Sequence, residues 1–201
     1  RPPVPPVIDE GNPDCAALFG LDTNTVGVAY TGWRSNQYRE EKDTSGHAVY
    51  LAVATVADAK TATQLLDNAL AKAVNSCDNA VIHLSGKYRW RFQKTDATDT
   101  GVRWTGTELE DGQITGWVCA SEARAKNNVV IYAQVCQWGN GAPAAATILD
   151  FSDILSRTVA VAGAPLPYWH TCAVMITLFF ARATLGQIQP VGFPSCSSVA
   201  V

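Results

Sequence analysis

Six cysteines constrain this chain more than any other feature of its sequence. Their number is even, no two of them form a Cys-x-x-Cys pair, and the histidines are isolated at His47, His83 and His170. Zinc sites need closely spaced ligands, so we expect no metal and no cofactor. The spacing favours disulfides and therefore an oxidising compartment, with buried free thiols as the alternative. The six are Cys15, Cys77, Cys119, Cys136, Cys172 and Cys196.

The size and charge of the chain limit its classes of partner. Its 201 residues can form one domain with a sizeable core, and 16% of them are charged, with a net charge of -3. Lys and Arg are scattered along the sequence. We therefore expect neither nucleic acid nor an anionic lipid surface as a partner.

The sequence opens on a Pro-rich run, residues 1–7, rather than on an apolar segment that would read as a signal peptide. Such runs form semi-rigid polyproline spacers, so residues 1–12 are predicted to be a linker. One interpretation is that this linker is a stalk that holds the domain away from a membrane. The membrane would then be contacted only by an anchor upstream of this sequence. A frayed terminus is the alternative.

Residue patterns predict alternating strands and one clear helix in the first half. Residues 25–31 and 47–55 alternate as strands do, and the polar run at 33–46 predicts a mobile loop. Residues 58–74 have an apolar stripe at helical spacing, with Asp58 at the N-cap. Three further strands are expected at 79–85, 88–94 and 101–108.

Residues 114–138 predict a β-hairpin with a defined register. Two alternating segments flank Asn127-Asn128, and Asn tolerates the positive φ of a tight turn. A turn there places Cys119 opposite Cys136, and Trp117 opposite Trp138. Directly opposed residues have α-carbons roughly 4.5–5.5 Å apart, which is within disulfide range.

The C-terminal part of the sequence indicates one more helix and a segment of uncertain packing. Residues 144–159 carry Ile148, Phe151, Leu155 and Val159 on one side, with Pro143 before the first turn. Residues 172–185 are apolar but too short for a membrane span, which needs about 20 apolar residues. We expect one domain over 13–160 and an extension over 161–201.

An ordered set of motifs resembles a known family. These are Asp14-Cys15, the strand and Ala-rich helix ending at Ser76-Cys77, the run 88–92 (YRWRF), Gly116-Trp-Val-Cys119, and then Asn127-Asn-Val-Val130 and Val135-Cys136. Over roughly residues 13–157 the chain resembles the PknH-like extracellular sensor domains of mycobacterial serine/threonine kinases and lipoproteins. The helix that precedes the first cysteine in that family is replaced here by the Pro-rich start, and residues 160–201 have no counterpart.

The resemblance implies a fold, two disulfides and a cleft. The fold is α+β, an antiparallel sheet flanked by helices, and the family's pairing carried over by position gives Cys15–Cys77 and Cys119–Cys136. With these fixed, Cys172–Cys196 is the disulfide that remains. A cleft between sheet and helix is implied as well. Arginines beside aromatic residues suit planar or anionic ligands, so the candidate cleft residues are Arg34, Tyr38, Arg89, Trp90, Arg91, Arg103 and Trp104. Strand alternation offers another interpretation, in which Trp90 is core while Arg89 and Arg91 face solvent.

No standard catalytic constellation is present in the sequence. There is no GxSxG, HExxH, Gly-rich phosphate loop or kinase signature, and the acidic clusters at 40–41 and 108–111 are typical of solvated faces. We expect a non-catalytic sensor or ligand-binding domain outside the cytoplasm, for an unidentified small-molecule or cell-envelope ligand. The alternative is a protein-interaction module, including a homodimer formed through residues 160–201. An enzyme with an unfamiliar site ranks third.

Overall fold

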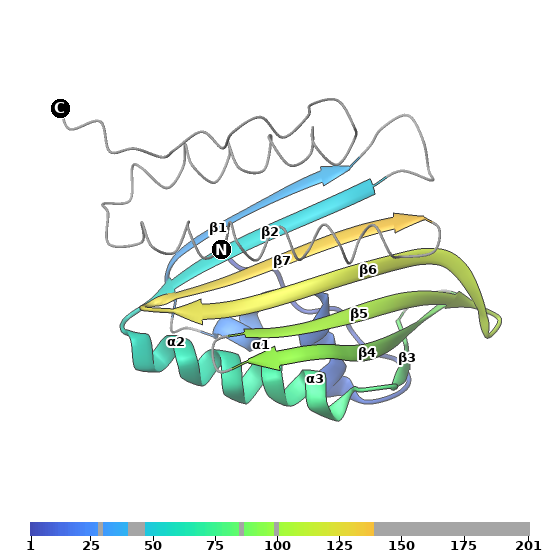
Figure 1. Cartoon of the computed structure of the whole chain (residues 1–201), viewed down its shortest axis with the longest axis horizontal. Coiled ribbons are helices and arrows are strands. Elements are labelled where there is room, and N and C mark those ends of the chain that lie inside the picture. Colours follow the sequence, from blue (N-terminus) through green and yellow to red (C-terminus); the bar gives the residue numbers. More distant parts are fainter. Residues whose placement is uncertain (28–29, 40–46, 85–86, 99–100, 139–201) are drawn as a thin grey trace.

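A computed structural model describes residues 1–27, 30–39, 47–84, 87–98 and 101–138, and Figure 1 shows their arrangement. Seven antiparallel strands form one sheet in the order β1-β2-β7-β6-β5-β4-β3. The strands are β1 (Tyr30–Arg39), β2 (His47–Val56), β3 (Val81–His83), β4 (Tyr88–Thr98), β5 (Gly101–Glu110), β6 (Gln113–Lys126) and β7 (Val129–Trp138). The helical elements are η1 (Pro13–Phe19), α1 (Thr23–Val26), α2 (Ala59–Leu65), η2 (Leu66–Ala71) and α3 (Lys72–Ser76).

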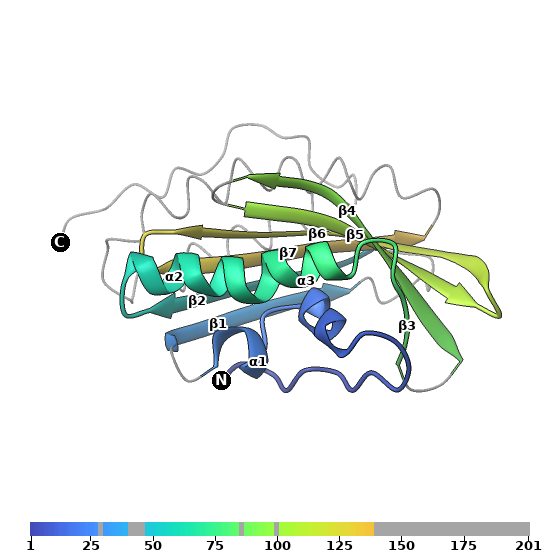
Figure 2. The same cartoon turned by 90° about the horizontal axis from the view of Figure 1, so that it is seen from below.

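The helix predicted over 58–74 is confirmed as the consecutive elements α2, η2 and α3. Asp58 is its N-cap and accepts a hydrogen bond from the Thr61 backbone N–H at 2.7 Å. The predicted apolar stripe faces the sheet, where Leu66 and Leu70 are buried in the core. Figure 2 shows this helix running along one face of the sheet, with η1 beside it. The described helices are few and short, so the fold is a large sheet with modest helical cover.

The prediction of a mobile loop at 33–46 is wrong for residues 33–39, which belong to β1. Trp33 is buried and lies opposite Ala54 of β2, so its burial drives the pairing. The polar residues that indicated a loop occupy an edge strand, where Arg34 and Ser35 are exposed to solvent. A strand with little apolar content can pair when one large side chain reaches the core. Residues 40–46 lie outside the described part.

The strand predicted over 25–31 is also wrong at its start. Residues 23–26 form the short helix α1, and β1 begins at Tyr30. The cause is a capping box: the Asp22 carboxylate accepts hydrogen bonds from the backbone N–H groups of Asn24 and Thr25, both at 2.8 Å. In return the Thr25 hydroxyl accepts from the Asp22 N–H at 2.7 Å. These bonds override the alternating pattern.

The predicted hairpin is confirmed in its turn and its register. Asn127 has φ +52°, and β6 pairs with β7 so that Cys119 faces Cys136 and Trp117 faces Trp138. The two cysteines form a disulfide with their Cα atoms 3.9 Å apart. The strands predicted at 88–94 and 101–108 are present and longer, while the strand predicted at 79–85 is reduced to β3.

The second disulfide fastens η1 to the end of α3. Cys15 and Cys77 are both fully buried, with Cα atoms 5.8 Å apart, which confirms the pairing implied by the family resemblance. The bond lies in the core between the helical elements and the sheet. The expected Cys172–Cys196 disulfide, the expected helix over 144–159 and the segment 160–201 lie outside the described residues.

The N-terminal segment makes backbone hydrogen bonds with the rest of the domain at two places. The carbonyl of Pro3 accepts a hydrogen bond from the Thr23 N–H at 2.9 Å. Further along, the Asp9 N–H donates to the His83 carbonyl at 2.9 Å, and the His83 N–H donates to the Glu10 carbonyl at 2.9 Å. Between these points the segment follows the lower edge of the molecule in Figure 2.

Candidate functional site

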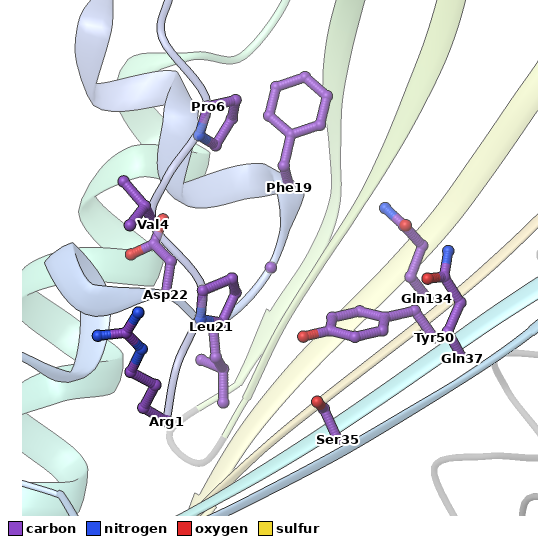
Figure 3. Close-up of a pocket in the computed structure, with 12 residues that line it drawn as sticks. Arg1, Val4, Pro6, Phe19, Leu21, Asp22, Ser35, Gln37, Tyr50 and Gln134 are labelled. Atoms are coloured by element: carbon purple, nitrogen blue, oxygen red, sulfur yellow. The ribbon is translucent and has the colours of Figure 1, made fainter.

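A cavity of about 570 Å³ lies between the Pro-rich start and the helix-bearing face of the sheet. Figure 3 shows its two walls, with the N-terminal segment and the η1–α1 connection on one side and strand residues on the other. A volume of this size suits a small organic molecule. The lining residues are Arg1, Pro3, Val4, Pro6, Phe19, Gly20, Leu21, Asp22, Ser35, Gln37, Tyr50 and Gln134.

The sheet wall is a row of polar side chains crossing three strands. Gln37 of β1 lies opposite Tyr50 of β2, and Tyr50 lies opposite Gln134 of β7, so the three share one face of the sheet. The Gln134 amide donates to the Ser121 hydroxyl at 3.2 Å. This wall offers both hydrogen-bond donors and acceptors, namely the side-chain carbonyl oxygen of Gln134, the Gln37 amide and the Tyr50 hydroxyl.

The opposite wall is mostly apolar and follows directly from η1. Phe19 is fixed by edge-to-face contacts with Trp90 and Phe92, at ring-centroid distances of 5.6 and 5.3 Å. Gly20 follows with φ +148°, and a Cβ there would lie 3.2 Å from the Tyr50 ring. A larger residue would be strained and would press on Tyr50, so Gly20 sets the distance between the walls.

Asp22 is the acidic group on this side of the cavity and is 3% exposed. Its Oδ1 caps α1, while its Oδ2 is buried without a hydrogen-bond partner. Burial raises the pKa of the Asp22 carboxyl above its ordinary value, and the backbone hydrogen bonds from Thr25 and Asn24 oppose this shift. Burial also raises the pKa of Tyr50, so its phenol stays neutral at physiological pH.

The seven residues proposed from sequence divide between the two faces of the sheet. Trp104 is 1% exposed within the core, where its Nε1 donates to the Leu18 carbonyl at 3.1 Å. Trp90 packs on Phe19 on the same face. The strand register places the arginines on the other face, since Arg103 lies opposite Glu122 whereas Trp104 lies opposite Ser121.

Two of the proposed arginines on that other face make structural ion pairs. Arg103 Nε lies 3.1 Å from the Glu122 carboxylate, which is 1% exposed and also contacts Arg124. Arg89 pairs with Glu10 at 2.7 Å. The three remaining residues are Arg34, whose guanidinium donates to the Trp33 carbonyl at 2.9 Å, Arg91, and Tyr38, of which only the backbone in β1 is described. None of the seven lines the cavity, and their role as ligand contacts stays a prediction.

Sequence reasoning missed the residues that do line the cavity. Gln134 interrupts the apolar run of β7, and this interruption is the one local signal of a polar position facing a cavity. Among the described residues, no cluster of three or more His, Cys, Asp or Glu side chains could hold a metal ion. No helix in this part of the chain is long and apolar enough to cross a membrane.

A family model described as PknH-like extracellular domain matches residues 3–152, about three quarters of the chain. The chain belongs to this family. The PknH-like match takes in most of the Pro-rich start as well as the sheet. A search of curated proteins finds no match.

Two solved structures resemble this PknH-like chain to very different degrees. The extracellular domain of PknH from Mycobacterium tuberculosis has a TM-score of 0.61 at 24% identity, covering 73% of this chain and 74% of that one. CalU16 from Micromonospora echinospora has a TM-score of only 0.30 at 8% identity, covering 78% and 91%. The PknH structure therefore shares this fold. Family membership and the buried disulfides together make the chain an extracytoplasmic, sensor-type domain.

Proposed function

We propose that this PknH-like domain binds a small, partly apolar ligand in the cavity between its N-terminal segment and its sheet. The observation that carries the proposal is the polar row Gln37, Tyr50 and Gln134, which crosses three strands and lines a cavity of about 570 Å³. Sheet faces beneath helices normally carry apolar residues, because a buried polar group is unfavourable unless it is hydrogen-bonded. Here Gln37 is exposed and Tyr50 and Gln134 are half-buried, so three polar side chains lie side by side on the cavity wall, where they are suited to hydrogen-bonding a bound molecule.

The opposite wall gives the ligand its apolar contacts. Phe19 and Leu21 face the polar row across the cavity, and Phe19 is held rigidly by Trp90 and Phe92. Preorganised walls reduce the entropy lost on binding. A ligand with one apolar side and one side rich in hydrogen-bonding groups fits both walls, and fragments of the cell envelope offer this combination.

We further propose that the domain performs no chemistry on its ligand. The two buried carboxylates in the described part both have structural partners: Asp22 caps α1, and Glu122 pairs with Arg103 and Arg124. In a receptor kinase, ligand binding would bias assembly of the receptor across the membrane. In a lipoprotein, it would serve capture or delivery of the ligand.

A thermal-shift panel of cell-wall fragments and anionic small molecules tests the proposal. Ser35 is an exposed strand residue that lines the cavity, so Ser35→Phe should fill part of it without disturbing the core. Gln93→Phe, at an exposed position of β4 outside the cavity, is the matched control. We expect at least one compound to raise the Tm of the wild type and of Gln93→Phe but not of Ser35→Phe. A broad panel without any shift, or an equal shift in all three proteins, would refute the proposal.

A second candidate function is protein interaction, favoured by exposed apolar residues near one end of the sheet. Ile114 is 62% exposed beside the β5–β6 turn, and Trp138, which contacts Trp117 at 5.4 Å between ring centroids, is 36% exposed. A homodimer formed through such a surface is tested by light scattering of the 201-residue chain. A monomer at all concentrations that remains monomeric with ligand would exclude the homodimer.

A further inference from the structure

Residues 1–6, named here the strap, form one side of the cavity. Arg1, Pro3, Val4 and Pro6 are four of the twelve lining residues, so the cavity is complete only while the strap is docked. Pro2 is buried against the domain, whereas Val4 is 82% exposed. The strap therefore rests on the domain with only part of its surface buried.

Within the described residues, one backbone hydrogen bond joins the strap to the rest of the domain. The Pro3 carbonyl accepts from the Thr23 N–H at 2.9 Å, and in the described part of the chain the next backbone bond of this segment is at Asp9. Four of the six strap residues are prolines, and proline has no N–H to donate. Local opening thus breaks few interactions, which places the strap among the low-stability parts of the domain.

The bond to the strap is adjacent to the buried carboxyl. Thr23 follows Asp22 directly, and Figure 3 shows Asp22 on the strap side of the cavity, across from Tyr50. The Asp22 Oδ2 atom has no hydrogen-bond partner and no contact with solvent while the strap is docked. A buried carboxylate oxygen in this state is unfavourable when charged and far less so when protonated.

We propose that the strap is a pH-sensitive closure of the cavity: it docks over the neutral Asp22 carboxyl and is released when that carboxyl ionises. Release hydrates Oδ2 and relieves the desolvation, while Oδ1 keeps its two bonds to α1. Among the residues that line the cavity, the other charged or titratable groups are Arg1 on the strap and the Tyr50 phenol on β2. At the far end of the segment, Glu10 pairs with Arg89, and His83 lies 3.8 Å from Asp9.

The direction of the pH dependence follows from the sign of the shift. Burial raises the pKa of Asp22 in the docked state, so docking is favoured at low pH. The favourable contribution of the neutral Asp22 carboxyl to docking of the strap is lost as the pH rises through this raised pKa. If the cavity binds a ligand as proposed above, a bound molecule contacts strap and sheet together and holds the strap closed. This coupling rests on the proposed function, whereas the pH-dependent docking does not.

The order parameter of the Val4 amide, measured by ¹⁵N relaxation without ligand, tests the inference. Between pH 4 and pH 7 we expect it to fall in the wild type from about 0.8 toward less than about 0.6, the ranges of rigid and flexible backbone. Asp22→Asn keeps the N-cap, because Asn caps as well as Asp, but it removes the titration. We expect its Val4 order parameter to be independent of pH.

Two more variants separate this switch from other causes. Asp58→Asn, at the exposed N-cap of α2, should retain the wild-type pH profile. Thr23→Pro removes the N–H bonded to Pro3 at the first position of α1, where proline is tolerated, and should leave Val4 flexible at every pH. A wild-type order parameter that does not change with pH would overturn the inference. The inference would also be overturned if Asp22→Asn showed the wild-type pH dependence of the Val4 order parameter. A rigid Val4 in Thr23→Pro at pH 4 would overturn it as well.

Discussion

Removing the Cys15–Cys77 disulfide should destabilise the domain more than removing Cys119–Cys136. The two bonds close loops of different length, with sequence separations of 62 and 17 residues. In the chain-entropy model these closures contribute about 4 and about 3 kcal/mol to the free energy of unfolding. Chain entropy alone thus predicts a difference of about 1 kcal/mol.

The native structure enlarges this difference. Cys119 and Cys136 lie within a ladder that pairs Trp117 through Lys126 with β7, so the hairpin keeps its register without the disulfide. Cys15 belongs to η1, a short 3-10 helix whose position depends on the link to α3. Losing that link also frees Phe19, which follows in the same element and lines the cavity.

Urea unfolding followed by circular dichroism measures the difference. The variants are Cys15→Ala/Cys77→Ala and Cys119→Ala/Cys136→Ala, each of which removes a whole bond and leaves no unpaired partner. We expect the first to lose at least about 1 kcal/mol more than the second by linear extrapolation. Equal midpoints, or a larger loss in the hairpin variant, would refute the reasoning.

Three further predictions concern single side chains. Trp104→Phe should lower the free energy of unfolding by about 2–4 kcal/mol in urea titrations, because it leaves a cavity and removes the donor to the Leu18 carbonyl. Asn127→Gly should leave the Tm unchanged within a few degrees, whereas Asn127→Val should lower it clearly, since φ +52° is unfavourable for a β-branched residue. Asp22→Asn should gain stability relative to the wild type as pH rises from 4 to 7, because burial raises the pKa of Asp22 and its ionisation destabilises the fold. Urea unfolding of both proteins at pH 4 and pH 7 checks the Asp22→Asn prediction. A difference in free energy of unfolding that is the same at both pH values would contradict it.

Local patterns were enough to predict much of the sheet. The hairpin register followed from Asn127-Asn128 and alternation alone, and the helix at 58–74 followed from its apolar stripe and Asp58. Both features depend on neighbours close in sequence. Most of β1 was not predicted, because a strand at the edge of the sheet can have a polar composition that resembles a loop. The helix α1 was not predicted, because a four-residue helix held by a capping box is too short to show a periodic pattern.

The candidate site was harder to predict for a topological reason. Gln37, Tyr50 and Gln134 come together because β7 inserts beside β2, which is far from it in sequence. No local pattern encodes that neighbour. The arginines and tryptophans were predicted as ligand contacts from their chemical type, without regard to the alternation of side chains along a strand. That alternation places Trp104 in the core and Arg103 on the opposite face of the sheet.

Backbone chemical-shift mapping of a bound compound tests ligand binding in the cavity most directly. A compound that raises the Tm would be titrated into the ¹⁵N-labelled 201-residue chain. We expect the largest shifts at Gln37, Tyr50 and Gln134 and at Phe19 across the cavity. Trp117 of β6, which does not line the cavity, should be unaffected. Shifts concentrated at Trp117, or at Arg91 and Arg103 on the other face of the sheet, would contradict the account.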